Sequence, residues 1–290
     1  ASAADSGNQE GIFGYGDIGP GSSLTNLVSN TGVVATDVAG VGTARHALAA
    51  TQYGGDKGIF GYGYVATFSS LTNLVSNTGV VATDTAGVGR ARYFPAACSY
   101  GEDKGIFGFG YYEPTTITAI TNLVTNAGVV GTDVAGVGTA RRNIAACEYG
   151  EDKGIFGYGL PTVSGSPTNL SNLVSNAGVV ATDTAGVGTS REWLAACSYG
   201  DDKGIFGYGS GPVSMTNLVS NAGVVGTDVT GVGTARGYLA ATQYGGDKGI
   251  FGYGQGPVSM TNLVTNAGVV GTDVTGVGTA RPSLAACSFN

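Results

Sequence analysis

One short motif returns six times along this chain, and this repetition constrains the fold more than any other feature. The motif is GIFGYG, or GIFGFG in one copy, and its copies begin 47, 47, 49, 50 and 45 residues apart, at Gly11, Gly58, Gly105, Gly154, Gly204 and Gly249. A period near 50 residues is too long for ankyrin or tetratricopeptide repeats and lies in the range of four-stranded propeller blades. The 290 residues therefore form six related units.

Each unit contains four short segments with the composition of β-strands. In the unit that follows Arg45 they are residues 46–53, 57–63, 71–77 and 79–85. Apolar, β-branched and aromatic residues favour strands, whereas the Gly, Asn and Asp residues between the segments favour tight turns. No segment has a convincing helical period. We expect an all-β fold in which every unit is a four-stranded antiparallel sheet.

The order of these segments resembles the kelch repeat. Residues 44–63, ARHALAATQYGGDKGIFGYG, are similar to its arginine, small-residue inner strand, turn and apolar strand ending in glycine. TNLVSN and TGVVATDT resemble its third and fourth strands, although Val80-Val81-Ala82 stands where kelch units carry a Trp, and Gly-Tyr-Gly replaces their Gly-Gly. The resemblance covers essentially the whole chain. It implies the strand order of a six-bladed β-propeller and no particular function.

The two ends of the chain predict how the six blades close. The repeats begin with a second strand at residues 11–16 and end with an additional first strand at residues 283–289. We expect this C-terminal strand to complete the N-terminal blade, so that blade 1 is divided between residues 11–40 and 281–290 of a single domain spanning 1–290. Such closure leaves no open strand edge between the first and last blades.

The glycines of the motif admit two interpretations. In the first, alternate glycines let neighbouring sheets approach closely, while Ile59, Phe60 and Tyr62 fill the space between them. In the second, the motif is a phosphate-binding loop, but GxGxxG serves that purpose only when a helix follows it. No helix is expected after any copy, so we favour the structural role.

Charge and hydropathy argue against two classes of partner. The 13 basic and 20 acidic residues give a net charge of −7, and no run of Lys or Arg occurs, so we expect no nucleic-acid binding. No apolar run approaches the roughly 18 residues of a membrane helix, so we expect no membrane insertion. Residues 1–10 lack the basic and apolar regions of a secretion signal. We expect an extracellular or surface-associated location.

Arginine and aspartate recur at fixed positions in all six units. The arginines are Arg45, Arg92, Arg141, Arg191, Arg236 and Arg281, and the aspartates, eight residues earlier, are Asp37, Asp84, Asp133, Asp183, Asp228 and Asp273. They form either an anion-binding rim, as in some kelch propellers, or repeated Asp–Arg pairs that join the fourth strand to the next blade. We favour the pairs, because equal numbers give every charge a partner.

The remaining reactive residues indicate no metal site and no cofactor. Cys98, Cys147, Cys197 and Cys287 share one repeat position that is Thr in the other two units, so we expect reduced, buried thiols. The chain has one histidine, which leaves no His/Cys cluster with zinc spacing. The repeated Asp-Lys turns lack the ligand spacing of an EF-hand and are expected only to solvate the chain reversals.

The units differ from one another at two places. One is the segment between GYG and the next TNL or SNL, which is 8, 8, 10, 11, 6 or 6 residues long. The other is the pair after each invariant arginine: His46-Ala47, Tyr93-Phe94, Arg142-Asn143, Glu192-Trp193, Gly237-Tyr238 and Pro282-Ser283. In an antiparallel blade, the connection between strands two and three and the start of strand one share a face. We expect the variable positions to converge there.

This variable face supplies the candidate ligand-binding residues. They are His46, Tyr64, Tyr93, Phe94, Tyr111, Tyr112, Glu113, Arg142, Glu192, Trp193 and Tyr238. Aromatic residues with scattered charges are typical of recognition surfaces, although loops also vary when they are unconstrained. We hypothesise a non-enzymatic module that binds a protein or glycan ligand, in a lectin-like, multivalent manner if six repeated pockets bind sugars.

Two other functions remain open. Near-identical units also suit a structural subunit that self-assembles on the outside of a cell or particle through its invariant surfaces. An enzyme is the third hypothesis, because the sequence alone does not exclude a fold in which His46 has Asp and Ser neighbours. The residues that break the repeat are mostly aromatic or small, whereas catalysis normally requires a polar, charged constellation. We therefore expect no catalytic residues.

Overall fold

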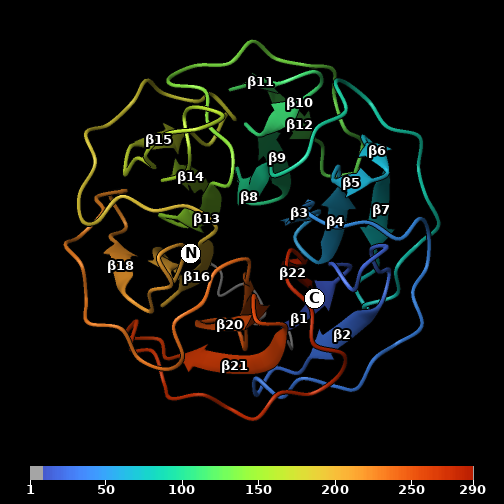
Figure 1. The fold of residues 1–290 in the computed structure, drawn as a ribbon, viewed down its shortest axis with the longest axis vertical. Coiled ribbons are helices and arrows are strands. Elements are labelled where there is room, and N and C mark those ends of the chain that lie inside the picture. The colour runs from blue at the N-terminus through green and yellow to red at the C-terminus, as the bar shows by residue number, and fades with distance from the viewer. Residues whose placement is uncertain (1–8, 290) are drawn as a thin grey trace.

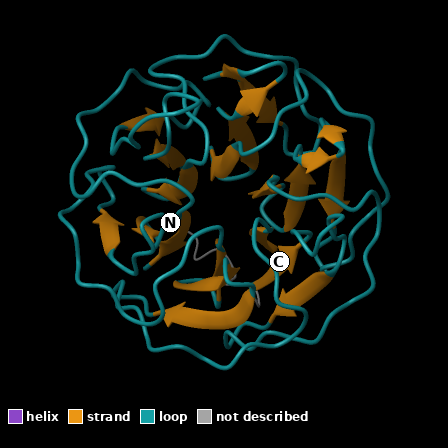
Figure 2. Ribbon diagram, in the orientation of Figure 1, coloured by secondary structure: helices purple, strands orange, loops and turns teal. Residues whose placement is uncertain are grey.

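All the regular secondary structure of the described residues is β-strand (Figure 2). The computed structural model describes residues 9–289, so residues 1–8 and 290, the ends of the predicted domain, lie outside the described residues. The predicted all-β class is confirmed. Within residues 9–289 there is no apolar helix of a length that could span a membrane.

Six three-stranded antiparallel sheets surround a central axis (Figure 1). The inner strands are β3 (Ala49–Tyr53), β8 (Ala96–Tyr100), β13 (Ala145–Tyr149), β16 (Ala195–Tyr199), β19 (Ala240–Tyr244) and β22 (Ala285–Phe289). The middle strands are β1 (Glu10–Gly14), β4 (Lys57–Gly61), β9 (Lys104–Gly108), β14 (Lys153–Gly157), β17 (Lys203–Gly207) and β20 (Lys248–Gly254). The outer strands are β2 (Thr25–Val28), β7 (Thr72–Val75), β12 (Thr121–Val124), β15 (Ser171–Val174), β18 (Thr216–Val219) and β21 (Val258–Val264). Each inner strand contacts the inner strands of both neighbouring sheets.

One of these sheets joins the two ends of the chain. Strand β22 pairs antiparallel with β1, with Cys287 opposite Ile12 and Phe289 opposite Glu10, and β2 pairs with the other edge of β1. The strand order β2-β1-β22 is the same inner-to-outer arrangement that the five other sheets make from consecutive strands. The C-terminal strand therefore completes the sheet that the N-terminal residues begin.

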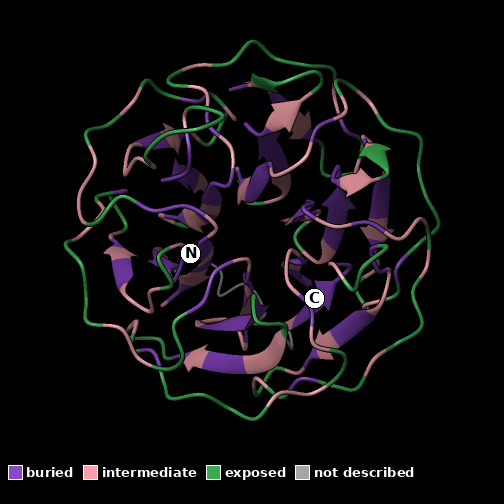
Figure 3. Cartoon of the chain, in the orientation of Figure 1, coloured by how far each residue is buried: buried purple, intermediate pink, exposed green. Residues whose placement is uncertain are grey.

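The fourth segment of each unit differs from the expectation of a fourth strand. In the unit of β4, residues 79–85 make only two isolated bridges to β7, Val75 with Val81 and Thr72 with Thr85. Between the bridges, the side-chain amide of Asn73 donates to the carbonyl of Ala82 and so replaces a ladder bond. The sheets consequently have three regular strands, and the fourth segment runs along the exposed outer edge (Figure 3).

Two variable segments form small hairpins where the sequence indicated only loops. Strands β5 (Tyr64–Val65) and β6 (Thr67–Phe68) make one hairpin, and β10 (Tyr111–Tyr112) and β11 (Thr116–Ile117) make the other. Both hairpins lie next to each other in sequence-adjacent units (Figure 1). They give two of the variable segments a fixed backbone.

The motif glycines are positions of close approach between neighbouring sheets, as predicted. A Cβ atom on Gly61 would lie 2.8 Å from Cζ of Phe107, and one on Gly58 would lie 2.5 Å from Sγ of Cys287. The same contact closes the ring, because a Cβ on Gly252 would lie 2.7 Å from Cζ of Phe13. Contacts under 3.0 Å leave no room for a side chain in a close-packed interior.

The invariant arginines form the polar part of each junction between sheets. Arg45 is fully buried, donates from Nε to the carbonyl of Tyr62 at 2.9 Å, and donates from Nη2 to Oδ1 of Asn73 at 2.6 Å. Its guanidinium also covers the ring of Tyr15 in the preceding unit, 4.4 Å from the ring centroid. One side chain therefore connects two sheets. The bond to the asparagine and the ring contact recur in all six units, whereas the bond from Nε to a carbonyl is absent at Arg92 and Arg141.

Each arginine also has an aspartate near it, but this aspartate comes from the end of the unit that the arginine opens rather than from eight residues earlier. Nη1 of Arg45 lies 3.8 Å from Asp84, and Nη1 of Arg281 lies 3.8 Å from Asp37, across the closure of the ring. The aspartate is hydrogen-bonded elsewhere, since Asp84 accepts from the hydroxyl of Thr43 at 2.6 Å and from Asn73 at 2.9 Å. The Asp–Arg pairing that the sequence favoured is therefore present. Asn73 bonds to both Arg45 and Asp84, and the guanidinium makes no bidentate contact with the carboxylate.

These aspartates predict a loss of stability in acid. Burial alone would raise the pKa of Asp84, but hydrogen bonds from Thr43 and Asn73 and the charge of Arg45 together hold the pKa below its ordinary value. The same holds for Asp37, Asp183, Asp228 and Asp273. A carboxyl with a lowered folded-state pKa stabilises the fold above its unfolded-state pKa, near 4, and loses that contribution as the pH falls further.

We expect the urea midpoint of unfolding to fall steeply below about pH 4, because five such carboxyls lose their contribution in the same range. The measurement is best made on the Glu148→Gln variant. Burial raises the pKa of Glu148, which lies on an inner strand, to about 7. The substitution keeps the titration of this residue from adding to the pH dependence. A midpoint that stays constant between pH 5 and about 3 would contradict this role of the aspartates.

Candidate functional site

The variable residues do converge on one face. Antiparallel bridges connect the residue after an invariant arginine with the first residue of a variable segment: His46 with Tyr64, Tyr93 with Tyr111, and Arg142 with Leu160. The bridges arise because the chain enters the inner strand beside the point where the middle strand of the same sheet ends. The two sources of sequence variation thus form a single surface.

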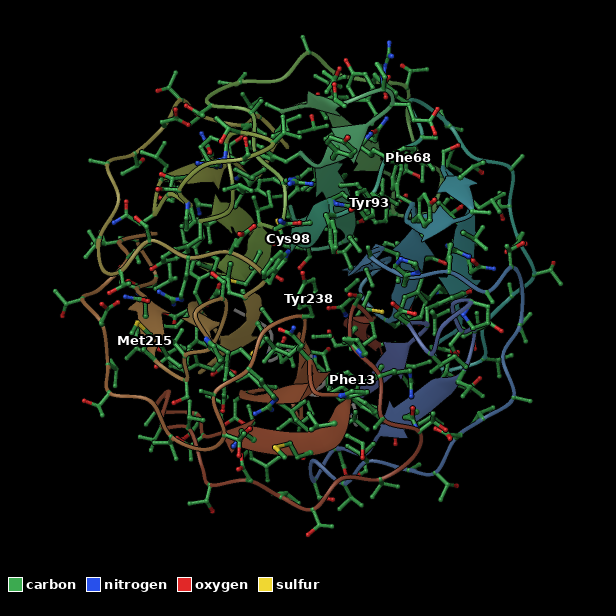
Figure 4. The ribbon with its side chains drawn as sticks, viewed as in Figure 1. Phe13, Phe68, Tyr93, Cys98, Met215 and Tyr238 are labelled. Carbon is green, nitrogen blue, oxygen red and sulfur yellow. The ribbon has the colours of Figure 1, made fainter. Side chains whose placement is uncertain are left out.

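Eight rings form a continuous aromatic band on this face. The band consists of His46, Tyr64, Phe68, Tyr93, Tyr111, Phe94, Tyr238 and Trp193. The centroids of neighbouring rings are 4.2 to 6.2 Å apart, within or just below the range of about 4.5 to 7 Å that aromatic pairs prefer. Every ring is half-buried. Of the three residues of the band that Figure 4 labels, Tyr238 lies nearest the axis, Tyr93 lies farther out, and Phe68, in strand β6, lies farthest from it.

The inner end of the band covers the mouth of the central channel. Trp193 and Tyr238 are stacked, with centroids 4.3 Å apart and planes inclined by 22°, and the ring of Phe94 lies 6.2 Å from that of Tyr238. These three residues come from three different units, so the repeat places them around one axis. We call the space that they border the mouth hollow.

The backbone at the mouth is the same in all six units although the side chains differ. The second residue after each invariant arginine has a positive φ of 53° to 57°: Ala47, Phe94, Asn143, Trp193, Tyr238 and Ser283. At five of the six junctions its N–H donates to the carbonyl of the preceding unit, at 2.8 to 3.1 Å. Positive φ is uncommon outside glycine, so these bonds impose the conformation and leave the side chain free to vary.

The outer end of the band borders a second space, the outer hollow, of about 520 Å³. It is lined by His46, Tyr64, Phe68, Tyr93, Tyr111, Glu113 and Pro114. Ligand pockets typically have volumes of about 300 to 1,000 Å³ with mostly aromatic walls and a few polar groups. The two hairpins, β5–β6 and β10–β11, supply most of this lining, so the hollow belongs to two units only.

Eight buried side-chain polar atoms of the described residues have no hydrogen-bond partner, and four of them lie on this face. These four are Nδ1 of His46, Nε of Arg142, Oδ1 of Asn143 and Nε1 of Trp193, all at the variable pair after an invariant arginine. A buried polar group without a partner costs about 1 to 3 kcal/mol, so native proteins contain few of them. Three of the other four belong to the invariant Arg92 and Arg141, so such atoms are not confined to the variable face.

The charged residues of the face are held in place by their neighbours. Glu192 is buried and its carboxylate accepts from Nδ2 of Asn143 at 2.5 Å, across the junction of two sheets. Arg142 donates to the carbonyl of Val163 at 3.1 Å, and its guanidinium lies 5.2 Å from the ring centroid of Tyr111. Burial lowers the pKa of His46, while the negative charge of Asp17 opposes that shift.

Two predicted site residues lie apart from the band. Tyr112 contacts Arg90 instead, whose guanidinium is 4.4 Å from its ring centroid, and both border a separate shallow space with Thr67. Glu113 is exposed and borders both this space and the outer hollow. Tyr112 therefore shares the face with the aromatic band but makes none of its ring contacts.

Three residues of the face were not among the sequence candidates. Phe68 lies in strand β6 and connects Tyr64 with Tyr111, and the signal for it was that it is the one phenylalanine in any variable segment. Asn143 follows a candidate directly but is neither aromatic nor charged. Asp17 opens a variable segment and acts on His46 through its charge alone.

The central channel below the mouth has a lining of small residues. Its wall consists of three consecutive residues from each of the six inner strands, such as Ala50, Thr51 and Gln52 in β3. Glu148 is the one carboxyl group among the described lining residues, and the hydroxyl of Ser99 donates to it. Desolvation raises the pKa of Glu148 to about 7.

The cysteines and the opposite face carry structural roles. Cys98, Cys147, Cys197 and Cys287 are free and buried between sheets, and burial raises the pKa of each thiol. In residues 9–289, no three His, Cys, Asp or Glu side chains are grouped so that they could hold a metal ion. The Asp-Lys turns do more than solvate the chain, because the N–H of Gly54 donates to the carbonyl of Asp103 in the next unit at 2.7 Å.

Comparison with known proteins gives no family to which the face could be assigned. No protein-family model matches the chain, and no curated protein matches it.

Proposed function

We propose that the six sheets are the blades of a single six-bladed β-propeller with the strand order of kelch repeats. Two observations support this proposal: the inner strands succeed one another around the axis, and β22 joins the first and last units. The fourth segment of each unit would be the outermost strand of its blade, held by two bridges instead of a full ladder.

We propose that this propeller is a non-enzymatic recognition module, with an extracellular or surface-associated location, that binds a protein or glycan ligand through its variable face. The observation that carries the proposal is the aromatic band, which borders the outer hollow on the one face where the units differ. Aromatic surface supplies contact area at low entropic cost.

The contacts of His46 and Glu192 favour binding over catalysis. A general base is normally within hydrogen-bond reach of a nucleophile and is oriented by a third group. Nδ1 of His46 has no hydrogen-bond partner. The buried carboxylate of Glu192 accepts from the amide of Asn143, which is too weak an acid to transfer a proton. We therefore assign His46 and Glu192 to ligand contact.

A glycan array tests this function, with three proteins compared on the same array. We expect the wild-type chain to bind, the double variant Tyr93→Ala/Trp193→Ala to lose at least tenfold in affinity, and Tyr112→Ala to bind as the wild type does. Tyr112 is the matched control, because it is a tyrosine of the same face that lies outside the band. Circular dichroism establishes that all three proteins fold alike.

Two results on that array would contradict the proposed site. One is equal binding by the wild type and the double variant, which would place the ligand elsewhere. The other is equal loss in the double variant and in Tyr112→Ala, which would mean that the band has no special role.

The outer rim favours one other function, self-assembly. The first valine of each fourth segment is 61 to 65% exposed: Val33, Val80, Val129, Val179, Val224 and Val269. Identical apolar side chains around a rim could associate laterally with further copies of the chain. Light scattering during size-exclusion chromatography decides this question, because the recognition function predicts a monomer and the assembly function predicts large polymers.

A further inference from the structure

The outer hollow has an aromatic wall that a ligand can reach. The rings of Tyr64, Phe68 and Tyr93 each contact the other two, with centroids 5.4 to 5.7 Å apart and planes inclined by 53° to 82°. Rings inclined at such angles do not stack face to face, so they leave part of each ring surface uncovered. All three rings are half-buried and line the hollow, which therefore offers a continuous apolar surface.

One charged side chain stands beside this wall. Glu113 is the only residue lining the hollow that is charged at neutral pH, since burial lowers the pKa of His46. It is exposed and begins the turn between β10 and β11, which the hydroxyl of Tyr111 stabilises by donating to the carbonyl of Pro114 at 3.3 Å. No basic side chain of the described residues forms an ion pair with Glu113. The hollow therefore combines apolar rings with one carboxylate that is free to pair.

Two arginines lie near the hollow but do not line it. The guanidinium of Arg142 lies 5.2 Å from the ring centroid of Tyr111, and that of Arg90 lies 4.4 Å from the ring centroid of Tyr112. Each positive charge is thus already in contact with a ring of its own. An ionic ligand inside the hollow faces Glu113 instead, which attracts a cation and repels an anion.

The size of the hollow suits a sugar. Its volume of about 520 Å³ lies within the range of ligand pockets and is far more than a single ammonium or methyl group fills. A pyranose ring presents C–H groups on its faces and polar groups at its edge, so it can lie against aromatic rings with its edge directed to a carboxylate. A lysine side chain would pair with Glu113 but cover little of the three rings, and a neutral sugar would leave Glu113 without a cation.

We infer that the outer hollow binds an amino sugar with a free ammonium group, with the pyranose ring against the aromatic wall and the ammonium paired with Glu113. This inference rests on the proposed recognition function and names the chemical class of the ligand, which is a basic oligosaccharide such as an oligomer of glucosamine. Acidic sugars, whose carboxylates would lie against Glu113, are disfavoured at this site.

Two residues that occur once in the chain report binding by nuclear magnetic resonance. His46, the single histidine, lines the outer hollow, and Trp193, the single tryptophan, borders the mouth hollow. The probes are a trimer of glucosamine, cellotriose, which has hydroxyls in place of the ammonium groups, and trilysine, which has ammonium groups but no pyranose ring. At a constant, mildly acidic pH, we expect the glucosamine trimer to shift the imidazole signals of His46 saturably and to bind about threefold to tenfold more tightly than cellotriose, the gain from one charged contact. Trilysine is expected to bind more weakly than the glucosamine trimer.

The variant Glu113→Gln tests the role of the carboxylate. We expect it to lower the affinity for the glucosamine trimer to the level of cellotriose and to leave cellotriose binding unchanged. The matched control is Glu102→Gln, which removes the same charge from an exposed residue in the turn between β8 and β9, on the opposite face. We expect this control to bind both sugars as the wild type does.

The results separate this inference from the function on which it rests. Equal affinity for the glucosamine trimer and cellotriose, equal losses in Glu113→Gln and Glu102→Gln, trilysine binding as tight as that of the glucosamine trimer, or a shift of the Trp193 signal without one of His46 would each overturn the amino-sugar assignment. Absence of any shift would overturn it too. The recognition function would stand in every one of these cases if the Tyr93→Ala/Trp193→Ala variant still loses a ligand found on the glycan array.

Discussion

Replacing Arg45 with methionine is expected to lower the free energy of unfolding by about 3 to 5 kcal/mol, the usual loss when one partner of a buried charged network is removed. Methionine keeps much of the apolar stem but removes the donors to Tyr62 and Asn73. It also leaves the carboxylate of Asp84 without its nearest cation, 3.8 Å away. Urea denaturation monitored by circular dichroism measures the effect.

The matched control is Arg90→Thr. Arg90 is an exposed arginine two residues before Arg92, and the other five units have threonine at its position, such as Thr43. A threonine hydroxyl there can donate to the nearby aspartate, as that of Thr43 does to Asp84 at 2.6 Å. We expect a change within about 0.5 kcal/mol. A loss for Arg45→Met no greater than for Arg90→Thr would show that the arginines do not hold the sheets together.

Replacing Gly61 with alanine is expected to cost about 1 to 3 kcal/mol through overpacking. The added Cβ would lie 2.8 Å from Cζ of Phe107, a fully buried ring of the next sheet that has no space in which to retreat. The two sheets must therefore separate locally, and the packing of β4 against β9 deteriorates. The urea midpoint of the variant reports this cost.

Gly131→Ala is the control for that substitution. A Cβ on Gly131 would meet nothing closer than the carbonyl oxygen of Leu123 at 3.5 Å, and the equivalent residue of another unit is already alanine, Ala82. We expect a stability within about 0.5 kcal/mol of the wild type. If Gly61→Ala were equally neutral, the motif glycines would owe their recurrence to something other than close sheet packing.

The frame could be predicted from the sequence because most of its interactions recur from unit to unit. A constraint such as the glycine opposite Phe107 recurs at a constant period, so the pattern alone indicated its structural role. The fourth strand was less predictable. The segment around Val81 has the composition of a strand, but the side chain of Asn73 competes for the carbonyl of Ala82, and this competition depends on a tertiary contact.

The partner of each arginine was also beyond sequence reasoning in detail. The repeat supplied equal numbers of Arg and Asp, but two aspartates are equally regular neighbours of Arg45, and only the fold places Asp84 rather than Asp37 beside it. The role of Asn73 was not predicted, because the sequence pattern does not distinguish a buried asparagine in TNL from an asparagine in a turn.

The candidate site was predictable as a location and less so as a set of contacts. The constant frame and variable segments identified the face and its aromatic residues, because antiparallel connectivity alone determines which loops lie together. The ring contacts of Phe68 depend on the β5–β6 hairpin, which lies in a variable segment and is therefore not indicated by any repeated sequence pattern. The free acceptor of Asn143 depends on its bond to Glu192 in another unit.

The backbone conformation explains how the frame stays constant while the side chains of the face vary. At the channel mouth, hydrogen bonds between units impose the same positive φ on residues as different as Ala47 and Trp193. Side chains at such positions can change without altering the path of the chain, so six nearly identical units can present six different residues around one axis. This arrangement is the central claim of the account: a symmetric frame that carries one asymmetric binding face.

The number of ligand molecules bound per chain tests that claim most directly. Isothermal titration calorimetry with the saccharide that binds most tightly on the glycan array gives this number together with the affinity. We predict a stoichiometry of one, because the aromatic band and its unpaired polar atoms occur once in the ring. A stoichiometry of six would contradict the account, because it would place the ligand on the repeated surfaces of the frame and leave the variable face without a function.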